Sequence, residues 1–123
     1  MNTLQKSYLK LADHKKGKRV WLQGLRLDEA GYQIGSFYSL KYDNDKNRVV
    51  LSLSDQIDGA MKVCRKKVGD HFYPLIDLVN QKLAKIFEAV ERVQVIIQEG
   101  VIIIEYHHFD RIRIEREKRL EQV

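Results

Sequence analysis

Residues 17–54 read GKRVWLQGLRLDEAGYQIGSFYSLKYDNDKNRVVLSLS, and this stretch decides the expected fold. Arg19–Leu25 has the composition of a strand, and LDEAG at 27–31 predicts a single helical turn closed by its glycine. The turn residues of Asp43–Asn47 separate SFYSLKYD from RVVLSLS, which is a hairpin pattern. We therefore expect a strand, a short helix and a hairpin in this order.

Residues 73–108, YPLIDLVNQKLAKIFEAVERVQVIIQEGVIIIEYHH, repeat this order at an offset of about fifty-five residues. Asn80 is the expected N-cap of a helix, and Glu99-Gly100 is the expected turn of a second hairpin. A strand with one hairpin cannot bury its own apolar face. Two such units packed together bury it, so the sequence predicts a small, mainly β barrel with short helices.

The remaining segments complete one expected domain over residues 1–123. The first fifteen residues carry Leu4, Tyr8 and Leu11 at helical spacing, which predicts an N-terminal helix. Residues 55–72 are expected to be a basic connector with one extended piece between loops. Residues 109–123 are dense in charge, which is typical of a solvated helix that is mobile or packs on a partner.

The net charge of +5 is unevenly distributed along the chain. Residues 1–54 contain ten Lys or Arg against five Asp or Glu, and residues 55–123 contain twelve against twelve. A basic excess confined to one half of a chain favours a polyanionic partner. The charge pattern itself does not determine the fold.

The location expected from the sequence is the cytoplasm. No basic segment followed by an apolar one opens the chain, so no secretion signal is expected. The longest nearly uncharged run, Val93–Ile104, contains Glu99 and is too short to span a bilayer, so no membrane contact is expected. The single cysteine, Cys64, agrees with a reducing compartment.

The segment VWLQGLRLDEAGYQIGSFYSLKYDNDKNRVVLSL resembles the swapped-hairpin element of the SpoVT/AbrB-like and SymE-like families. The matching positions of their strand–turn–hairpin pattern are Leu27, Ala30, Gly31, Tyr32 and Gly35. The resemblance implies two interlocked elements, here as tandem copies in one chain, and a DNA-binding function of AbrB type.

A second resemblance covers most of the chain. The segments KVCRKKVGDHFYPLIDLVNQKLAKIF, RVQVIIQEGVIIIEYHH and REKRL are similar to the N-terminal domain of a group of DNA cytosine methyltransferases. The matching positions are Pro74, Ile76, Asp77, Leu78, His107, His108, Arg116 and Glu117. A Pro-Cys nucleophile is absent, because Cys64 follows Val63. The resemblance therefore implies a recognition domain without the enzyme, either a stand-alone relative or a fragment.

The candidate DNA-binding residues are the Lys and Arg side chains of the basic segments, which would release counterions from phosphates. They are Lys15, Lys16, Lys18, Arg19, Arg26, Arg48, Lys62, Arg65, Lys66 and Lys67. Arg19, Arg26, Arg48 and Arg65 are the better candidates for base edges, since a guanidinium pairs with guanine through two hydrogen bonds. The alternative is an ordinary solvated surface.

Other kinds of site have less support. His107 and His108 point to opposite faces of a strand and do not easily chelate one ion, so neither a metal nor another cofactor is expected. Trp21 and Tyr38 could stack on bases, but a place in the core is the preferred interpretation. The sequence shows no nucleophile, base and orienting group together, so no catalytic residue is assigned and the protein is not expected to be an enzyme.

Three functions remain open. The first is a non-enzymatic module that binds duplex DNA, acts in transcription regulation or as a DNA-recognition accessory, and forms a homodimer. The second is a protein–protein interaction module, such as an antitoxin or an inhibitor or subunit of a defence or DNA-processing system, that uses its charged C-terminal tail. The third is an RNA-acting toxin of the SymE-like kind.

Overall fold

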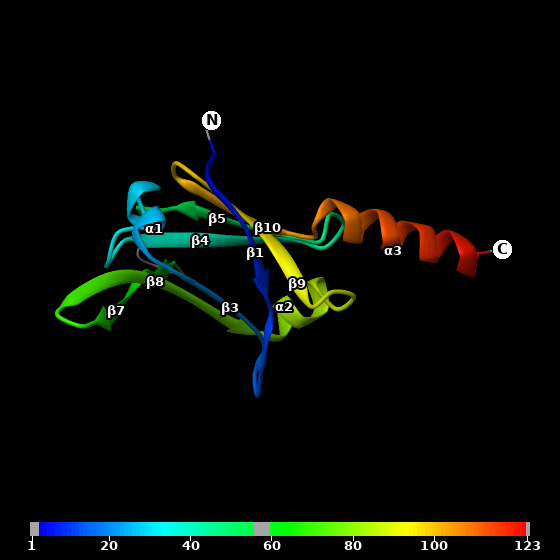
Figure 1. Ribbon diagram of the computed structural model, residues 1–123, viewed down its shortest axis with the longest axis horizontal. Helices are drawn as coiled ribbons and strands as arrows, with labels where there is room; N and C mark the ends of the chain where they lie inside the picture. Colours follow the sequence, from blue (N-terminus) through cyan, green and yellow to red (C-terminus); the bar gives the residue numbers. More distant parts are fainter. Residues whose placement is uncertain (1–2, 56–59, 123) are drawn as a thin grey trace.

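The computed structural model describes residues 3–55 and 60–122 of the chain (Figure 1). The strands are β1 (Thr3–Lys10), β2 (Ala12–His14), β3 (Gly17–Gln23), β4 (Phe37–Asp43), β5 (Arg48–Leu53), β6 (Met61–Lys62), β7 (Cys64–Val68), β8 (His71–Asn80), β9 (Arg92–Gln98) and β10 (Val101–Glu105). The helices are α1 (Leu25–Glu29), α2 (Gln81–Ile86) and α3 (His108–Glu121).

The strands form two antiparallel sheets that pack face to face. Sheet A has the strand order β1-β9-β10-β5-β4-β6, and sheet B has the order β2-β3-β8-β7. Figure 1 shows β3, β7 and β8 as a layer beneath β4 and β5, with α3 extending away at one end. The core lies between the layers, where Val20 and Ile76 of sheet B and Leu51 and Ile102 of sheet A are buried.

Equivalent strands of the two repeats pair with each other. The leading strands β3 and β8 are antiparallel neighbours in sheet B, with Leu22 opposite Ile76. The final strands β5 and β10 are antiparallel neighbours in sheet A, with Leu51 opposite Ile102. Each sheet therefore contains strands of both repeats at its centre, and neither repeat has a core of its own.

Each repeat also binds the hairpin turn of the other. The Tyr32 hydroxyl lies 2.9 Å from the Leu51 carbonyl and 3.1 Å from the carbonyl of Gly100, whose amide donates to Ala30 O at 2.8 Å. In the reverse direction, Asn47 Nδ2 donates to the Ile86 carbonyl at 2.8 Å. Gly100 and Asn47 both have positive φ, +77° and +49°, which the turns require. These contacts fix the helix ends of one repeat against the turns of the other.

Several local predictions are confirmed. The fold is mainly β, both hairpins form, and the helical turn α1 precedes Gly31, which has φ +96°. Asn80 caps α2, because its Oδ1 accepts the Leu83 amide at 2.9 Å. The C-terminal helical segment is α3. Among the described residues, no helix is long and apolar enough to cross a bilayer.

The prediction of an N-terminal helix is wrong. Residues Thr3–Lys10 form β1, which pairs with β9 from Lys10 opposite Arg92 to Thr3 opposite Gln98. Leu9 of this strand packs against the core and Leu11, directly after the strand, is buried, while Tyr8 remains 46% exposed. The open edge of β9 provides backbone partners for the segment, and this pairing outweighs the helical spacing of its apolar residues.

The connector also differs from expectation. Within residues 60–72, β6 pairs with β4, and β7 pairs with β8 along its whole length. The segment is therefore mostly strand, with more extended structure than the one piece expected. Residues 56–59 lie outside the described part of the chain.

Candidate nucleic-acid interface

The outer face of sheet B, which points away from sheet A, carries cations of β3 and β7 around the ring of Trp21. Val20 and Leu22 of β3 point inward and are buried. Because side chains alternate along a strand, Arg19, Trp21 and Gln23 lie on the outer face. This face gathers side chains from repeat one and from the former connector.

Arg19 is held in place by a carboxylate from the other repeat. Its Nε donates to Asp77 Oδ1 at 2.8 Å and its Nη2 donates to Asp77 Oδ2 at 2.9 Å. The hydrogen bond to Asp77 raises the pKa of Arg19, so the guanidinium stays charged. The Arg19 Cζ also lies 4.4 Å from the centre of the Trp21 ring. The guanidinium is thus oriented by an ion pair and an aromatic ring together.

Trp21 receives a second cation from β7. The Lys66 Nζ lies 4.8 Å from the ring centre, and the indole Nε1 donates to Gln23 Oε1 at 2.9 Å. Trp21 is only half-buried, so its predicted place in the core is wrong, whereas Tyr38 is buried as predicted. The outer face of sheet B therefore carries an aromatic ring between a cation of repeat one and a cation of the former connector.

The charge of the chain is concentrated in sheet B. Residues 12–23 and 64–80, which make up its strands and hairpin turns, contain seven Lys or Arg against three Asp. This is a net charge of +4 out of the +5 of the whole chain. Sheet B thus brings together basic segments from both halves of the chain.

Seven of the ten predicted cations lie in sheet B. Lys15 and Lys16 are exposed in the turn between β2 and β3. Lys18 pairs with Asp13, whose pKa this hydrogen bond lowers. The others are Arg19 on β3 and Arg65, Lys66 and Lys67 on β7.

The other three predicted cations lie elsewhere. Arg26 is on α1 and forms an ion pair with Glu29 at 2.7 Å. Arg48 is on β5 in sheet A and contacts Glu105 at 2.7 Å. Lys62 is on β6 at the edge of sheet A, where it lines a shallow hollow with Arg65. The structure therefore does not unite all ten residues on one surface.

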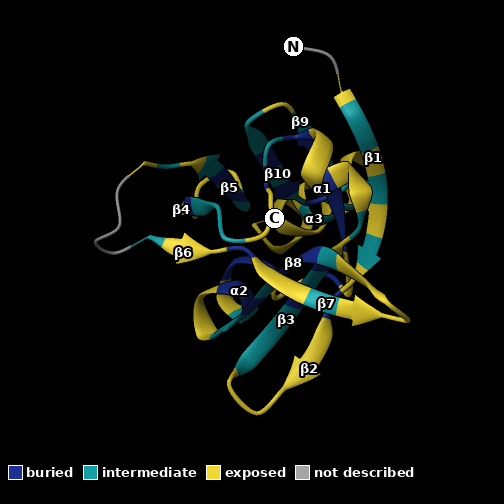
Figure 2. Ribbon diagram, turned by 90° about the vertical axis from the view of Figure 1, so that its left-hand side faces the viewer, coloured by how far each residue is buried: buried dark blue, intermediate teal, exposed yellow. Residues whose placement is uncertain are grey.

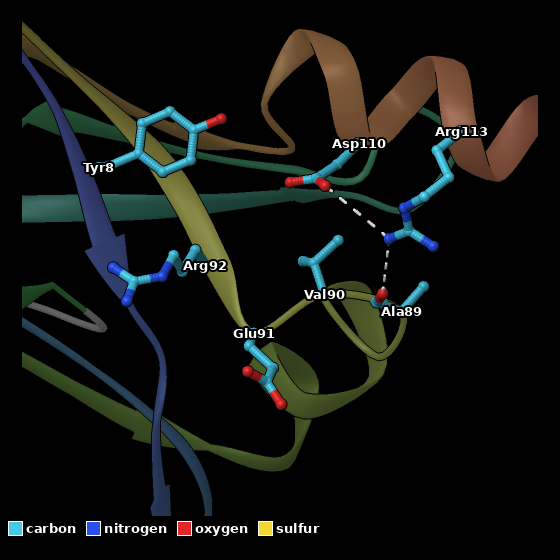
Figure 3. Close-up of a pocket in the computed structure, with 7 residues that line it drawn as sticks. All are labelled: Tyr8, Ala89, Val90, Glu91, Arg92, Asp110 and Arg113. Carbon is cyan, nitrogen blue, oxygen red and sulfur yellow. Dashed lines mark hydrogen bonds and ion pairs between the residues drawn. The ribbon is translucent and has the colours of Figure 1, made fainter.

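A separate concavity of about 380 Å³ lies where α3 leaves the body of the protein (Figure 3). Figure 3 shows Arg113 directed at the Asp110 carboxylate, 3.8 Å away, and at the Ala89 carbonyl, 3.4 Å away. Glu91 and Arg92 add one charge of each sign to its lining. The charges of this concavity balance, so it has no preference for a polyanion. Within residues 3–55 and 60–122, no group of three or more His, Cys, Asp or Glu side chains could hold a metal ion.

Several residues that shape the outer face of sheet B are not among the candidates expected from the sequence. Asp77, matched only to the methyltransferase pattern, orients Arg19 from 58 positions away in the chain. Phe72 and Val68, exposed by 47% and 51% near the β7–β8 turn, were not assigned any role. The period-two alternation of Val20 and Leu22 with Trp21 is the one signal that places Trp21 on the outer face.

Comparisons with protein-family models, with curated protein sequences and with solved structures found no match for this chain.

Proposed function

We propose that this protein is a non-enzymatic module that binds duplex DNA through sheet B and its hairpin turns. The observation that carries the proposal is the concentration of charge in this sheet, seven Lys or Arg against three Asp. Phosphate contacts by Lys and Arg supply most of the affinity of DNA-binding proteins. Arg65, on β7, has a guanidinium of the kind that pairs with guanine.

The AbrB-like resemblance supports the same proposal. Its matching residues have structural roles here, because Leu27, Ala30 and Tyr32 are buried and Gly31 and Gly35 have positive φ. A tandem swapped-hairpin arrangement agrees with the pairing of β3 with β8 and of β5 with β10. In this proposal the module acts in transcription regulation or as a DNA-recognition accessory.

The test is a fluorescence-anisotropy titration of a labelled mixed-sequence duplex at two salt concentrations. We expect binding at low salt that weakens strongly as salt increases, because the face of sheet B contacts phosphates. A single-stranded RNA of equal length serves as the competitor that distinguishes the SymE-like alternative. Preference for that RNA, or failure to bind the duplex at low salt, would exclude the proposal.

A protein–protein interaction module is the second candidate, and α3 is the observation that favours it. None of the side chains of α3 is buried, and the helix extends away from both sheets (Figure 1). Phe109 and Leu120 are 73% and 70% exposed on it. Co-purification of a stable protein partner that is lost when residues 109–123 are deleted, with no nucleic acid bound, would favour this candidate.

Homodimer formation belongs to the DNA-binding proposal as a separate expectation. The tandem repeats already supply both central strand pairings within one chain. A second chain is thus not needed to complete either pairing. Sedimentation equilibrium of the full chain, with and without duplex DNA, measures whether two copies associate.

A further inference from the structure

The β7–β8 hairpin extends one end of sheet B beyond its other strands. The pairing of β8 with β3 ends at Leu75 opposite Gln23, whereas its pairing with β7 continues to His71 opposite Val68. Among the described strands, β7 is therefore the only one that pairs with residues 71–74 of β8. Figure 1 shows the hairpin turn at the end of the molecule opposite to α3, and Figure 2 shows β7 exposed along most of its length.

The hairpin carries cations and apolar side chains together. Arg65, Lys66 and Lys67 are consecutive on β7, and Asp70 is the one acidic residue of segment 64–73. The Arg65 Cζ lies 4.7 Å from the centre of the Phe72 ring. Because strand residues alternate, Lys67 and Phe72 share one face of the hairpin, and Lys66 shares the other with Val68.

We infer that this hairpin enters the major groove of the duplex DNA that sheet B binds, which rests on the function proposed above. A two-stranded ribbon fits the major groove, about 12 Å wide, whereas the minor groove is about half as wide. A ribbon with long side chains on both faces is too thick for the narrower groove. The continuity of β7 with the basic face of sheet B favours DNA over a membrane or an apolar protein partner.

In this arrangement the side chains of the β7–β8 hairpin make different contacts with the DNA. Lys66 and Lys67 point to opposite faces, so they reach the phosphates of the two strands that border the groove. Phe72 provides apolar contact with thymine methyl groups, and Arg65, positioned by the Phe72 ring, lies beside guanine O6 and N7. Val68 extends the apolar surface at the turn.

The experiment combines affinity with a groove-specific footprint. The full chain is titrated against a labelled mixed-sequence duplex as wild type, as the double variant Arg65→Ala with Phe72→Ala, and as Lys67→Glu. The matched control is Lys41→Ala with Lys118→Ala, which removes exposed cations outside sheet B. Dimethyl sulfate then reports protection of guanine N7, in the major groove, and of adenine N3, in the minor groove.

We expect each hairpin variant to bind about tenfold or more weakly than wild type, while the control stays within about twofold. We also expect wild type to protect guanine N7. Hairpin variants that bind like the control, protection confined to adenine N3, or hairpin-dependent binding to anionic vesicles instead of DNA would overturn the inference. The first two of these results leave the DNA-binding proposal intact, whereas a wild-type protein that binds no duplex removes both. Lys67→Glu keeps the test valid should the double variant fail to fold.

Discussion

Lys66 of β7 and Trp21 of β3 lie together on the outer face of sheet B, with the lysine Nζ 4.8 Å from the centre of the indole ring. The two residues come from opposite halves of the chain. Their contact depends on β8, which pairs with β3 on one side and with β7 on the other. The basic surface is therefore a product of the packed repeats, and it does not belong to repeat one alone.

The effect of the Asp77 charge on the affinity for duplex DNA can be tested with an isosteric substitution. Asp77→Asn removes an anion from the basic face but keeps a side chain that can contact Arg19. We expect duplex DNA to bind about two- to fivefold more tightly at low salt, because less charge opposes the phosphates. Anisotropy titration measures the change. Glu105→Gln, which alters the equivalent ion pair of Arg48 in sheet A, is the control and should leave the affinity unchanged.

An unchanged affinity of Asp77→Asn would argue against an interface on this face. A residue that only positions Arg19 would lower the affinity when replaced, so the direction of the change separates the two roles.

The hydroxyl of Tyr32 should contribute measurably to stability. Tyr32→Phe removes the contacts to the Leu51 and Gly100 carbonyls, which are 2.9 and 3.1 Å away, and leaves buried acceptors without this donor. We expect the free energy of unfolding in urea to fall by about 1–3 kcal/mol. Tyr8→Phe, at a tyrosine that is 46% exposed, is the matched control and should change it little. Equal effects of both variants would show that the contact between the repeats is unimportant.

Alkaline pH should unfold the protein through its buried tyrosines. Burial raises the pKa of Tyr38 from 10.0 to about 12 and also raises that of Tyr32. Because the pKa is higher in the folded state, the tyrosines of the unfolded chain lose their protons at a lower pH. The contribution of these tyrosines to the free energy of unfolding is therefore fully present below about pH 10. It should be lost between about pH 10 and 12. Urea unfolding followed by circular dichroism at pH 9, 10 and 11 measures this loss.

The variant Tyr38→Phe should show a shallower decline over the same pH range, since one titrating group is removed. A decline of equal steepness in wild type and variant would assign the alkaline sensitivity to other groups.

Local signals in the sequence predicted much of the fold. Gly100, Asn47 and Asn80 act through their own backbone conformation or cap, so the turns and the start of α2 could be recognised from the sequence. Strand β1 could not, because its helical spacing of Leu4 and Tyr8 is outweighed by the edge of β9, more than eighty positions away.

The sequence predicts which Lys and Arg residues belong to the candidate site, but it does not predict where the fold places them. Lys and Arg in 15–19 and 65–67 were expected to meet DNA, and their place in one sheet agrees with that expectation without testing it. The ion pairs of Arg26 and Arg48 could not be foreseen for different reasons. The first depends on the side-chain conformations within α1, and the second on the pairing of β5 with β10.

The salt dependence of duplex binding tests the central claim most directly. For wild type, the logarithm of the association constant should fall linearly with the logarithm of the salt concentration, with a slope of about −3 or steeper. Lys66→Ala with Lys67→Ala should make this slope shallower by about 2, since two phosphate contacts are lost, while Lys41→Ala with Lys118→Ala should preserve it. A slope near zero, or equal slopes for the two double variants, would contradict DNA binding through sheet B.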